Sequence, residues 1–166
     1  HYESVLVCKV HPEYNLSEKV WKSVDEINEN FWQNRYESIR DFEKHLARNG
    51  TKIVKIFLHV SPEEQKQRFL DRINEEDKNW KFSAADLKER ARFGDYMEAY
   101  EEAINETSKE HAPWFVVPAD KKWFARLTAL QIIIDALEDM NLKYPELPEN
   151  EKKALEEAKK QLENEK

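Results

Sequence analysis

The sequence has 166 residues, of which 40% are hydrophobic and 37% are charged, and its net charge at pH 7 is −7. Eight Phe, six Tyr and five Trp residues make it too aromatic for a disordered chain, and its polarity excludes a protein embedded in a membrane. The negative charge gives no general attraction for nucleic acid or other polyanions, so a polyanion site has to be a local basic patch. No apolar run approaches the roughly 18 residues of a membrane helix and no signal peptide is recognisable, so we expect a cytoplasmic protein.

Short runs rich in β-branched and aromatic residues predict strands at 5–10, 53–60 and 115–117. Between the first two runs, apolar residues recur at three-, four- and five-residue steps. This spacing predicts helices over 20–31 and 36–46.

Local signals mark where helices begin and end. Ser17 is an expected N-cap and Gly50 an expected C-terminal stop, while the segment 61–64 combines a serine cap, a first-turn proline and two glutamates. Further along, apolar residues from 123 to 137 predict another amphipathic helix. The charged segment 149–166 predicts a peripheral helix.

Strands separated by long helices require crossover connections, which predict a parallel sheet with helices on its faces and therefore an α/β fold. The nearly continuous apolar run from Ile53 to Leu58 suits a strand that is buried on both faces. In open parallel sheets, ligands bind beyond the carboxyl ends of the strands. The residues expected near such a site are His59, Ser61, Pro118, Ala119 and Asp120.

Several common sites are excluded by the residues that the sequence lacks. Gly50 and Gly94 are the only glycines, and neither belongs to a GxxxxGK[ST] or GxGxxG motif, so the chain has no glycine-rich loop for a phosphate. The histidines lack zinc-binding spacing such as HExxH. The single cysteine, Cys8, excludes an intrachain disulfide and a multi-thiolate site, so we expect no metal site built from this chain.

A local excess of positive charge lies between Lys66 and Arg92, where eight basic residues accompany six acidic ones. Within it, Arg68 and Arg72 are one helical turn apart, so a helix would present both guanidinium groups on one side. Guanidinium groups bind phosphate oxygens through paired hydrogen bonds, which suits a lid over a polyphosphate or a nucleotide. The alternative is a solvated helix with ion pairs one turn apart, such as Glu64 with Arg68, and the spacing allows both interpretations.

Two ordered segments carry motifs of a known family. The first is TKIVKIFLHVS at 51–61, followed by EQKQRF at 64–69 and NWKFS at 79–83, and it resembles the strand-and-lid region of family-2 polyphosphate kinases. The second is HAPW at 111–114 followed by VPADKKWFAR at 117–126, and it is similar to that family's last core strand and the helix after it. The opening residues, His1-Tyr2-Glu3, resemble the tail of the family's second phosphate-site motif.

The resemblance implies a partial P-loop-kinase-like three-layer fold with parallel strands, a helical lid and a C-terminal helix. It also implies Mg²⁺-dependent, reversible phosphoryl transfer between inorganic polyphosphate and a nucleoside mono- or diphosphate, carried out by a homo-oligomer. By this interpretation Arg68 and Arg72 contact the transferred phosphates as catalytic residues. The implied polyphosphate path comprises Lys78, Lys81, Arg90 and Arg92, and the implied nucleotide contacts are Asp120 and Lys122.

The family's glycine-rich loop, with its lysine and Mg²⁺-associated aspartate, is not in these residues. We therefore expect the chain to be the carboxyl-terminal half of such a kinase and to be inactive by itself. The expected division is a kinase-like part at 1–145, with the lid at about 62–108, and a peripheral helical tail at 146–166. The alternative is a catalytically silent module for assembly or polyphosphate binding, and the sequence does not distinguish AMP, ADP and guanine nucleotides.

Aromatic side chains near these motifs are expected to be structural. Trp80, Trp114 and Trp123 should pack in the core or within the lid, because tryptophan is a largely buried residue type, and stacking on a base is the alternative. His59 and His111 are also expected to be structural, because phosphoryl transfer depends on positioning and charge more than on a histidine base.

Overall fold

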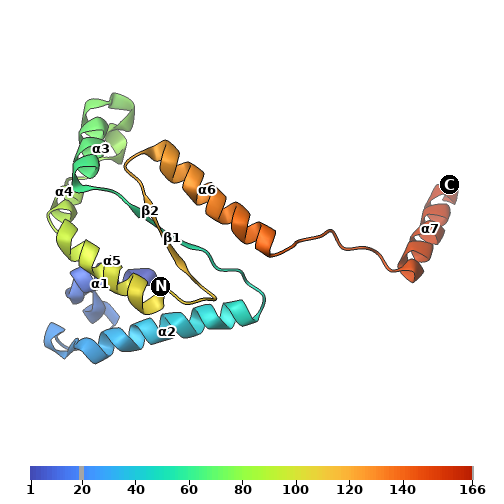
Figure 1. The fold of residues 1–166 in the computed structure, drawn as a ribbon, viewed down its shortest axis with the longest axis horizontal. Helices are drawn as coiled ribbons and strands as arrows, with labels where there is room; N and C mark the ends of the chain where they lie inside the picture. Colours follow the sequence, from blue (N-terminus) through green and yellow to red (C-terminus); the bar gives the residue numbers. More distant parts are fainter. Residues whose placement is uncertain (19–20, 166) are drawn as a thin grey trace. The chain divides into compact units, whose positions relative to one another are not determined.

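The computed structural model describes residues 1–18 and 21–165. Two compact units divide the chain, His1–Ala136 and Leu137–Lys166. Figure 1 shows the order of the elements along the chain. The helices are α1 (Val7–Val10), α2 (Glu29–Arg48), α3 (Pro62–Asn74), α4 (Ala84–Arg90), α5 (Phe93–Thr107), α6 (Lys122–Asp139) and α7 (Glu149–Asn164), with short 3₁₀ helices at Tyr2–Ser4, Pro12–Glu18, Val24–Glu26 and Glu76–Lys81 and strands β1 (Lys55–His59) and β2 (Trp114–Pro118).

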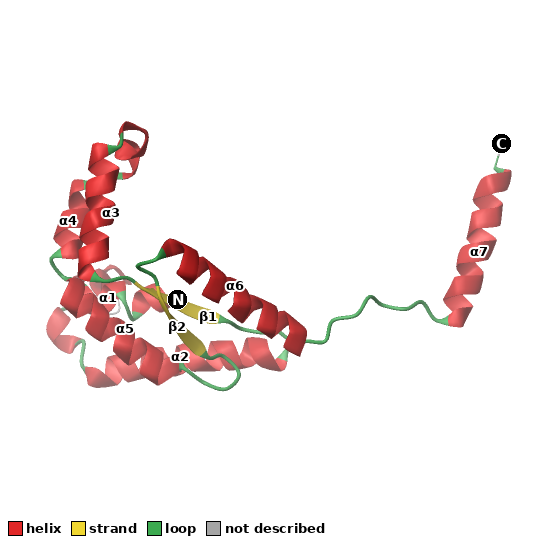
Figure 2. Cartoon of the chain, turned by 45° about the horizontal axis from the view of Figure 1, so that its top comes forward, coloured by secondary structure: helices red, strands yellow, loops and turns green. Residues whose placement is uncertain are grey.

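The two strands pair in parallel, with Lys55 opposite Trp114 and His59 opposite Pro118. They lie side by side among the helices in Figure 2. The connection between them passes through α3, α4 and α5, which is the long crossover that a parallel pair requires. The prediction of an α/β fold with parallel strands is therefore confirmed.

Helices pack on both faces of this strand pair. On one face, Val117 and Ala119 are buried together with Ala125 of α6, and Ile56 packs against them. On the other face, the ring of Phe57 stacks on Tyr100 of α5, with ring centroids 4.4 Å apart. Successive residues of a strand point to opposite faces, so the apolar run of β1 contributes to both packing layers.

The predicted strand at 5–10 is wrong, because Val7–Val10 form the short helix α1. Val5, Leu6 and Val10 are buried in one cluster with Phe31 and Trp32 of α2. A short apolar run does not by itself separate a strand from a buried helical turn, and here tertiary packing overrides the β propensity of valine.

The predicted helix over 20–31 is also wrong in its boundaries. Asn28 is the N-cap of α2, since its side chain accepts a hydrogen bond from the Phe31 N–H at 3.2 Å. The expected cap, Ser17, lies inside a 3₁₀ helix and donates its hydroxyl proton to the Tyr14 carbonyl. Val24 belongs to another 3₁₀ helix, and Val20 lies outside the described residues.

Other helix signals are confirmed. Gly50 ends α2 with a φ of 86°, a left-handed conformation that glycine adopts without steric cost. The Ser61 hydroxyl accepts a hydrogen bond from the Glu64 N–H at 3.1 Å and caps α3, whose first residue is Pro62. The two last predicted helices correspond to α6 and α7.

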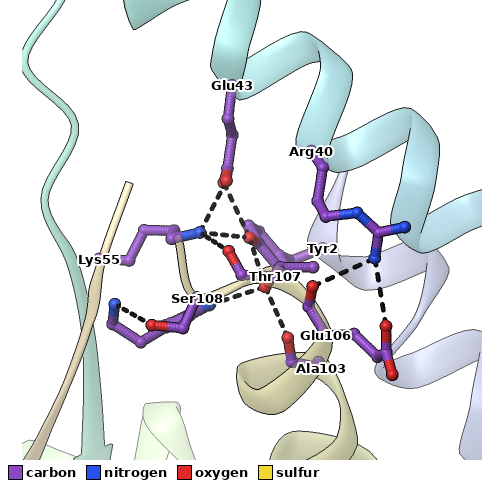
Figure 3. Close-up of polar contacts among 9 residues, drawn as sticks. Tyr2, Arg40, Glu43, Lys55, Ala103, Glu106, Thr107 and Ser108 are labelled. Atoms are coloured by element: carbon purple, nitrogen blue, oxygen red, sulfur yellow. Dashed lines mark hydrogen bonds and ion pairs between the residues drawn. The ribbon is translucent and has the colours of Figure 1, made fainter. Parts of the chain in front are cut away.

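A buried polar network joins the amino ends of the strands to the surrounding helices (Figure 3). Lys55 Nζ donates hydrogen bonds to Glu43 Oε2 at 2.7 Å, to the Thr107 carbonyl at 2.9 Å and to the Tyr2 hydroxyl at 2.9 Å. These bonds use all three donors of the ammonium group. The other Glu43 oxygen lies 2.8 Å from the Tyr2 hydroxyl, and Trp114 Nε1 donates to Thr107 Oγ1 at 2.9 Å.

Burial raises the pKa of the Tyr2 phenol above its ordinary value, and the Glu43 carboxylate beside it raises the pKa further. The phenol therefore keeps its proton and can donate it within the network. Because Lys55 and Glu43 are both buried, each charge depends on the other for compensation.

We expect Glu43→Ala to lower the free energy of unfolding by about 3–5 kcal/mol, because it leaves the Lys55 ammonium buried without its counter-charge. Urea denaturation of the chain measures the loss. Replacing both partners, as in Glu43→Leu with Lys55→Met, should cost much less than the single change. Glu149→Ala is the control, since its pair with Lys152 is exposed and should contribute less than about 1 kcal/mol. Equal losses for Glu43→Ala and Glu149→Ala would contradict this account.

Candidate functional site

The loops that follow the two strands are fastened together at the carboxyl edge of the sheet. The Ser61 N–H donates to Asp120 Oδ1 at 2.7 Å, and the Ala119 N–H donates to the His59 carbonyl at 2.8 Å. Arg68 of α3 adds a third link, because its Nη2 donates to the Ala119 carbonyl at 2.6 Å. The start of α3 therefore lies against the loop between β2 and α6, where open parallel sheets bind ligands.

The Asp120 carboxylate is held as an anion in this position. Its hydrogen bonds from Ser61 are the main cause that lowers the pKa of the carboxyl group, and the positive charge of Arg68 lowers it further. Ser61 is also the N-cap of α3, so Asp120 accepts a donor at the positive end of that helix. A negative group is thus already bound at this helix terminus.

The two arginines of α3 have different surroundings. Arg68 is held on both sides, since its Nε donates to Glu64 Oε1 at 2.8 Å while its Nη2 reaches the β2–α6 loop. Arg72, one turn further along, lies with its guanidinium carbon 5.3 Å from the Phe69 ring centroid and its Nη1 3.8 Å from Asp86 Oδ2. Arg68 thus fastens the two loops together, and Arg72 is less tightly held.

The remaining basic residues fall into two groups. Arg90 returns to the start of α3, because its Nη1 donates to the Pro62 carbonyl at 2.9 Å and to Gln65 Oε1 at 2.7 Å. Arg92 donates to the Val10 carbonyl. Lys78 and Lys81 lie beyond the other end of α3, which is roughly 20 Å long for its 13 residues.

These two lysines have partners from the same short segment. Lys78 pairs with Glu75, whose carboxylate raises the pKa of the ammonium group. Lys81 Nζ lies 5.0 Å from the ring centroid of Trp80. Lys122, at the start of α6, is exposed. The structure thus brings Arg68, Arg90 and Asp120 together around the start of α3, and it places Lys78 and Lys81 elsewhere.

The packing expected for the tryptophans is confirmed only for Trp114, whose ring meets that of Tyr2 edge to face, with centroids 5.1 Å apart. Trp80 is 79% exposed and Trp123 is 65% exposed, so the expectation that they pack in the core or lid is wrong for both. Among the described residues, neither ring has enough apolar surface beside it to be covered.

Sequence reasoning missed two polar clusters. The first is the network of Lys55 and Glu43, which the lysine inside an otherwise apolar run could have signalled. The second joins the amino-terminal segment to α4 and α5, where His11 Nε2 lies 2.9 Å from Glu89 Oε2 and the Tyr96 hydroxyl donates to the same oxygen at 2.7 Å. Hydrogen bonds from His11 and Tyr96 lower the pKa of the Glu89 carboxyl group.

Within 1–18 and 21–165, the structure brings together no group of three His, Cys, Asp or Glu side chains that could hold a metal ion. The same part of the chain contains no helix that is both long and apolar enough to span a membrane.

The paired strands, the joined loops and the arginine-bearing helix define an α/β protein with its candidate ligand site at the carboxyl edge of the sheet. Residues 13–145 match the family "Polyphosphate kinase 2 (PPK2)". Because this match spans most of the sequence, the chain belongs to the polyphosphate kinase 2 family.

Known proteins agree with this assignment. The chain is 49% identical over 162 residues to an ADP-polyphosphate phosphotransferase of Rhodopseudomonas palustris, covering 98% of this chain and 56% of that protein. It is 43% identical to an AMP/ADP-polyphosphate phosphotransferase of Meiothermus ruber, covering 88% of this chain and 50% of the relative. The crystal structure of polyphosphate kinase 2 from Arthrobacter aurescens superposes with a TM-score of 0.78 at 40% identity, over 93% of this chain and 50% of the other. The chain thus spans about half the length of these relatives.

The lowered pKa of Asp120 fixes the sign of a pH effect on stability. The stabilisation from its bond to Ser61 should be complete above the ordinary aspartate pKa of about 3.9 and should be lost as the pH falls through the lower folded-state value. We expect Asp120→Asn to be less stable than the unmodified chain at neutral pH, and the difference to shrink below about pH 4. Urea denaturation across a pH series measures both curves. A difference that stays constant into acid would show that the carboxylate charge plays no part.

Proposed function

We propose that the chain forms part of a kinase that transfers phosphoryl groups between inorganic polyphosphate and a nucleoside mono- or diphosphate. Family membership supports this proposal, as do the names of relatives that act on polyphosphate with ADP or AMP. The structural observation that carries it is the position of α3. This helix begins at the carboxyl end of β1 and carries Arg68 beside the loop that holds Asp120, with Arg72 one turn further along, in the last turn of the helix.

The proposed site fits the physical needs of phosphoryl transfer. The transferred group carries dense negative charge, and catalysis depends on positioning the reactants and on stabilising that charge. Because the chain as a whole is acidic, the positive charge has to be local. In this proposal Arg72 contacts the transferred phosphates directly. Arg68 holds the β2–α6 loop, and its positive charge also attracts these phosphates.

The other residues have roles that follow from their chemistry. Lys78, Lys81, Arg90 and Arg92 line the path of the polyphosphate. The bond of Arg92 to the Val10 carbonyl ties the lid segment, about 62–108, to the rest of the unit, whereas the bond of Arg90 to the Pro62 carbonyl joins two parts of that segment. The Asp120 carboxylate accepts hydrogen bonds and repels phosphate, so it would contact the base or ribose of the nucleotide. The exposed Lys122 is its cationic neighbour.

The proposal includes the P-loop-kinase-like three-layer architecture, the division into 1–145 and a helical tail at 146–166, a homo-oligomer and a cytoplasmic location. It also includes Mg²⁺ as a cofactor. The described residues bring together no group of three His, Cys, Asp or Glu side chains, so in this proposal the protein ligands of the ion come largely from outside this chain. We therefore assign no catalytic step in this chain to the ion.

The direct test compares the chain alone with a fusion to the part of the Rhodopseudomonas palustris relative that lies outside the match. We expect the chain alone to give no ATP from polyphosphate and ADP, because its sequence contains no glycine-rich loop to hold the nucleotide phosphates. The fusion should regain turnover, measured by the ATP formed. Turnover by the chain alone would refute the proposed inactivity, and a folded but inactive fusion would favour a silent polyphosphate-binding module.

Within the active fusion, we expect Arg72→Ala to lower kcat by about 10³-fold, because an arginine that stabilises transferred charge can contribute that much. The melting temperature should change little, since the pair of Arg72 with Asp86 is long and partly exposed. Arg68→Ala should lower both turnover and stability, because Arg68 also holds the β2–α6 loop. Lys153→Ala, in the helical tail, is the control. Near-normal turnover of Arg72→Ala would support the solvated-helix interpretation of α3.

A further inference from the structure

The outer part of the lid segment, residues 62–92, is held in place mainly by polar contacts. All of these residues are described, and none of those in α3, in the following 3₁₀ helix or in α4 is buried. Both views show α3 and α4 projecting beyond the strands (Figure 1 and Figure 2). Burial of apolar surface is the main force that fixes packed elements, and a helix as short as α4 is unstable by itself. The position of α4 therefore depends on its polar contacts with other elements.

Glu89, near the end of α4, is the centre of the contact between α4 and the amino-terminal segment. Its Oε2 lies 2.9 Å from His11 Nε2 and accepts a hydrogen bond from the Tyr96 hydroxyl at 2.7 Å. His11 is placed by its own surroundings, since its ring stacks on that of Tyr14 with centroids 5.1 Å apart and its Nδ1 lies 3.3 Å from Glu13 Oε1. One carboxylate oxygen thus joins α4 to α5 and to the segment before Pro12.

The ionisation of these groups agrees with their geometry. The hydrogen bond from His11 is the main cause that lowers the pKa of the Glu89 carboxyl group, and the bond from Tyr96 lowers it further. Burial raises the pKa of the Tyr96 phenol, so the phenol keeps the proton that it donates. Because an ionised carboxylate only accepts hydrogen bonds, His11 Nε2 carries the proton in this contact. Hydrogen bonds to an ionised acceptor are stronger than neutral ones.

The residues just after Glu89 include two arginines of the proposed polyphosphate path. Arg90 donates to the Pro62 carbonyl and Arg92 donates to the Val10 carbonyl. Arg92 is also the residue before α5, and its side chain makes no capping hydrogen bond to that helix. The corner between α4 and α5 therefore lacks a side-chain cap, and the bonds of Glu89 to His11 and Tyr96 help to fix the direction in which it carries both arginines.

We propose that Glu89 is a positioning residue for polyphosphate: held by His11 and Tyr96, it fixes the corner between α4 and α5 so that Arg90 and Arg92 are oriented before the polyanion binds. The inference rests on the proposed function and deepens it. A guanidinium group has five N–H donors, so bonds to backbone carbonyls leave donors for phosphate. Groups that are ordered in advance lose less conformational entropy on binding, which raises the affinity.

The proposal predicts an effect opposite in sign to that of charge alone. Removing a carboxylate beside a polyanion site reduces repulsion, so simple electrostatics predicts tighter binding. Removing a side chain that orients two arginines predicts weaker binding. Glu98 provides the comparison, because it is an exposed glutamate of α5 and its replacement removes the same charge.

The test measures the equilibrium binding of a fluorescently labelled polyphosphate of defined length to the fusion described above, by fluorescence anisotropy, so it does not require turnover. We expect Glu89→Ala and His11→Ala each to raise the Kd by about tenfold, because each removes the bond between α4 and the amino-terminal segment. Glu89→Gln keeps an acceptor oxygen and should raise the Kd by only about threefold. Glu98→Ala should leave the Kd unchanged or lower it.

A second comparison shows whether Glu89 acts through the arginines. When Arg90→Ala and Arg92→Ala are both present, adding Glu89→Ala should raise the Kd by less than about twofold, because no guanidinium group remains to be oriented. In an active fusion, Glu89→Ala should raise the KM for polyphosphate while kcat and the KM for ADP stay within about twofold. Circular dichroism checks that each variant is folded, and the milder Glu89→Gln keeps the test decisive if Glu89→Ala does not fold.

Several results would overturn the proposal. Unchanged or tighter binding by the folded Glu89 variants would show that Glu89 is an ordinary surface carboxylate. An undiminished effect of Glu89→Ala without Arg90 and Arg92 would show that it does not act through them. A fusion that binds no polyphosphate would overturn both this inference and the proposed polyphosphate path. A fusion that binds polyphosphate with the expected pattern but forms no ATP would support the inference and count against the proposed phosphoryl transfer.

Discussion

The buried contact between Lys55 and Glu43 is the interaction on which the amino-terminal unit depends. It joins β1 to α2 directly, and the same ammonium group reaches Tyr2 near the amino terminus and Thr107 at the end of α5. Elements far apart in sequence therefore meet at one charge. A buried ion pair is seldom more stable than an apolar pair of similar volume, but its bonds are directional, and here they fix the register of β1 against the helices. That register determines which residues lie in the loop that follows the carboxyl end of β1.

At the carboxyl ends of the strands, directional side-chain bonds again position the surrounding elements, but these contacts are weaker and more exposed. Arg68 and Arg90 bond to backbone carbonyls around the first turn of α3, so the orientation of the helix is set by side chains that also carry the positive charge of the site. Positioning and electrostatics are thus functions of the same residues. Arg72 is held only by a ring contact and a long ion pair, so its guanidinium group has weaker contacts than those of Arg68 and Arg90.

The sequence was most informative where a local signal and the tertiary contacts agree. The cap at Ser61, the left-handed Gly50 and the apolar run of β1 could all be recognised, and they give the parallel architecture and the place of the site. The run at 5–10 could not be assigned correctly, because its valines are buried by α2, a contact that depends on residues more than twenty positions away. The bonds of Arg68 to the Ala119 carbonyl and of Arg90 to the Pro62 carbonyl were equally hidden, since every residue possesses a backbone carbonyl.

The capped start of α3 has a consequence for ligand choice. A helix amino terminus is normally an attractive place for a phosphate, but this one already holds the Asp120 carboxylate through the Ser61 N–H. Because the chain holds Asp120 at this position, its carboxylate competes with any other anion for the Ser61 N–H. An incoming dianion at this point has to displace it or arrive with its own counter-cation. A neutral group that donates hydrogen bonds meets no such barrier at this helix terminus.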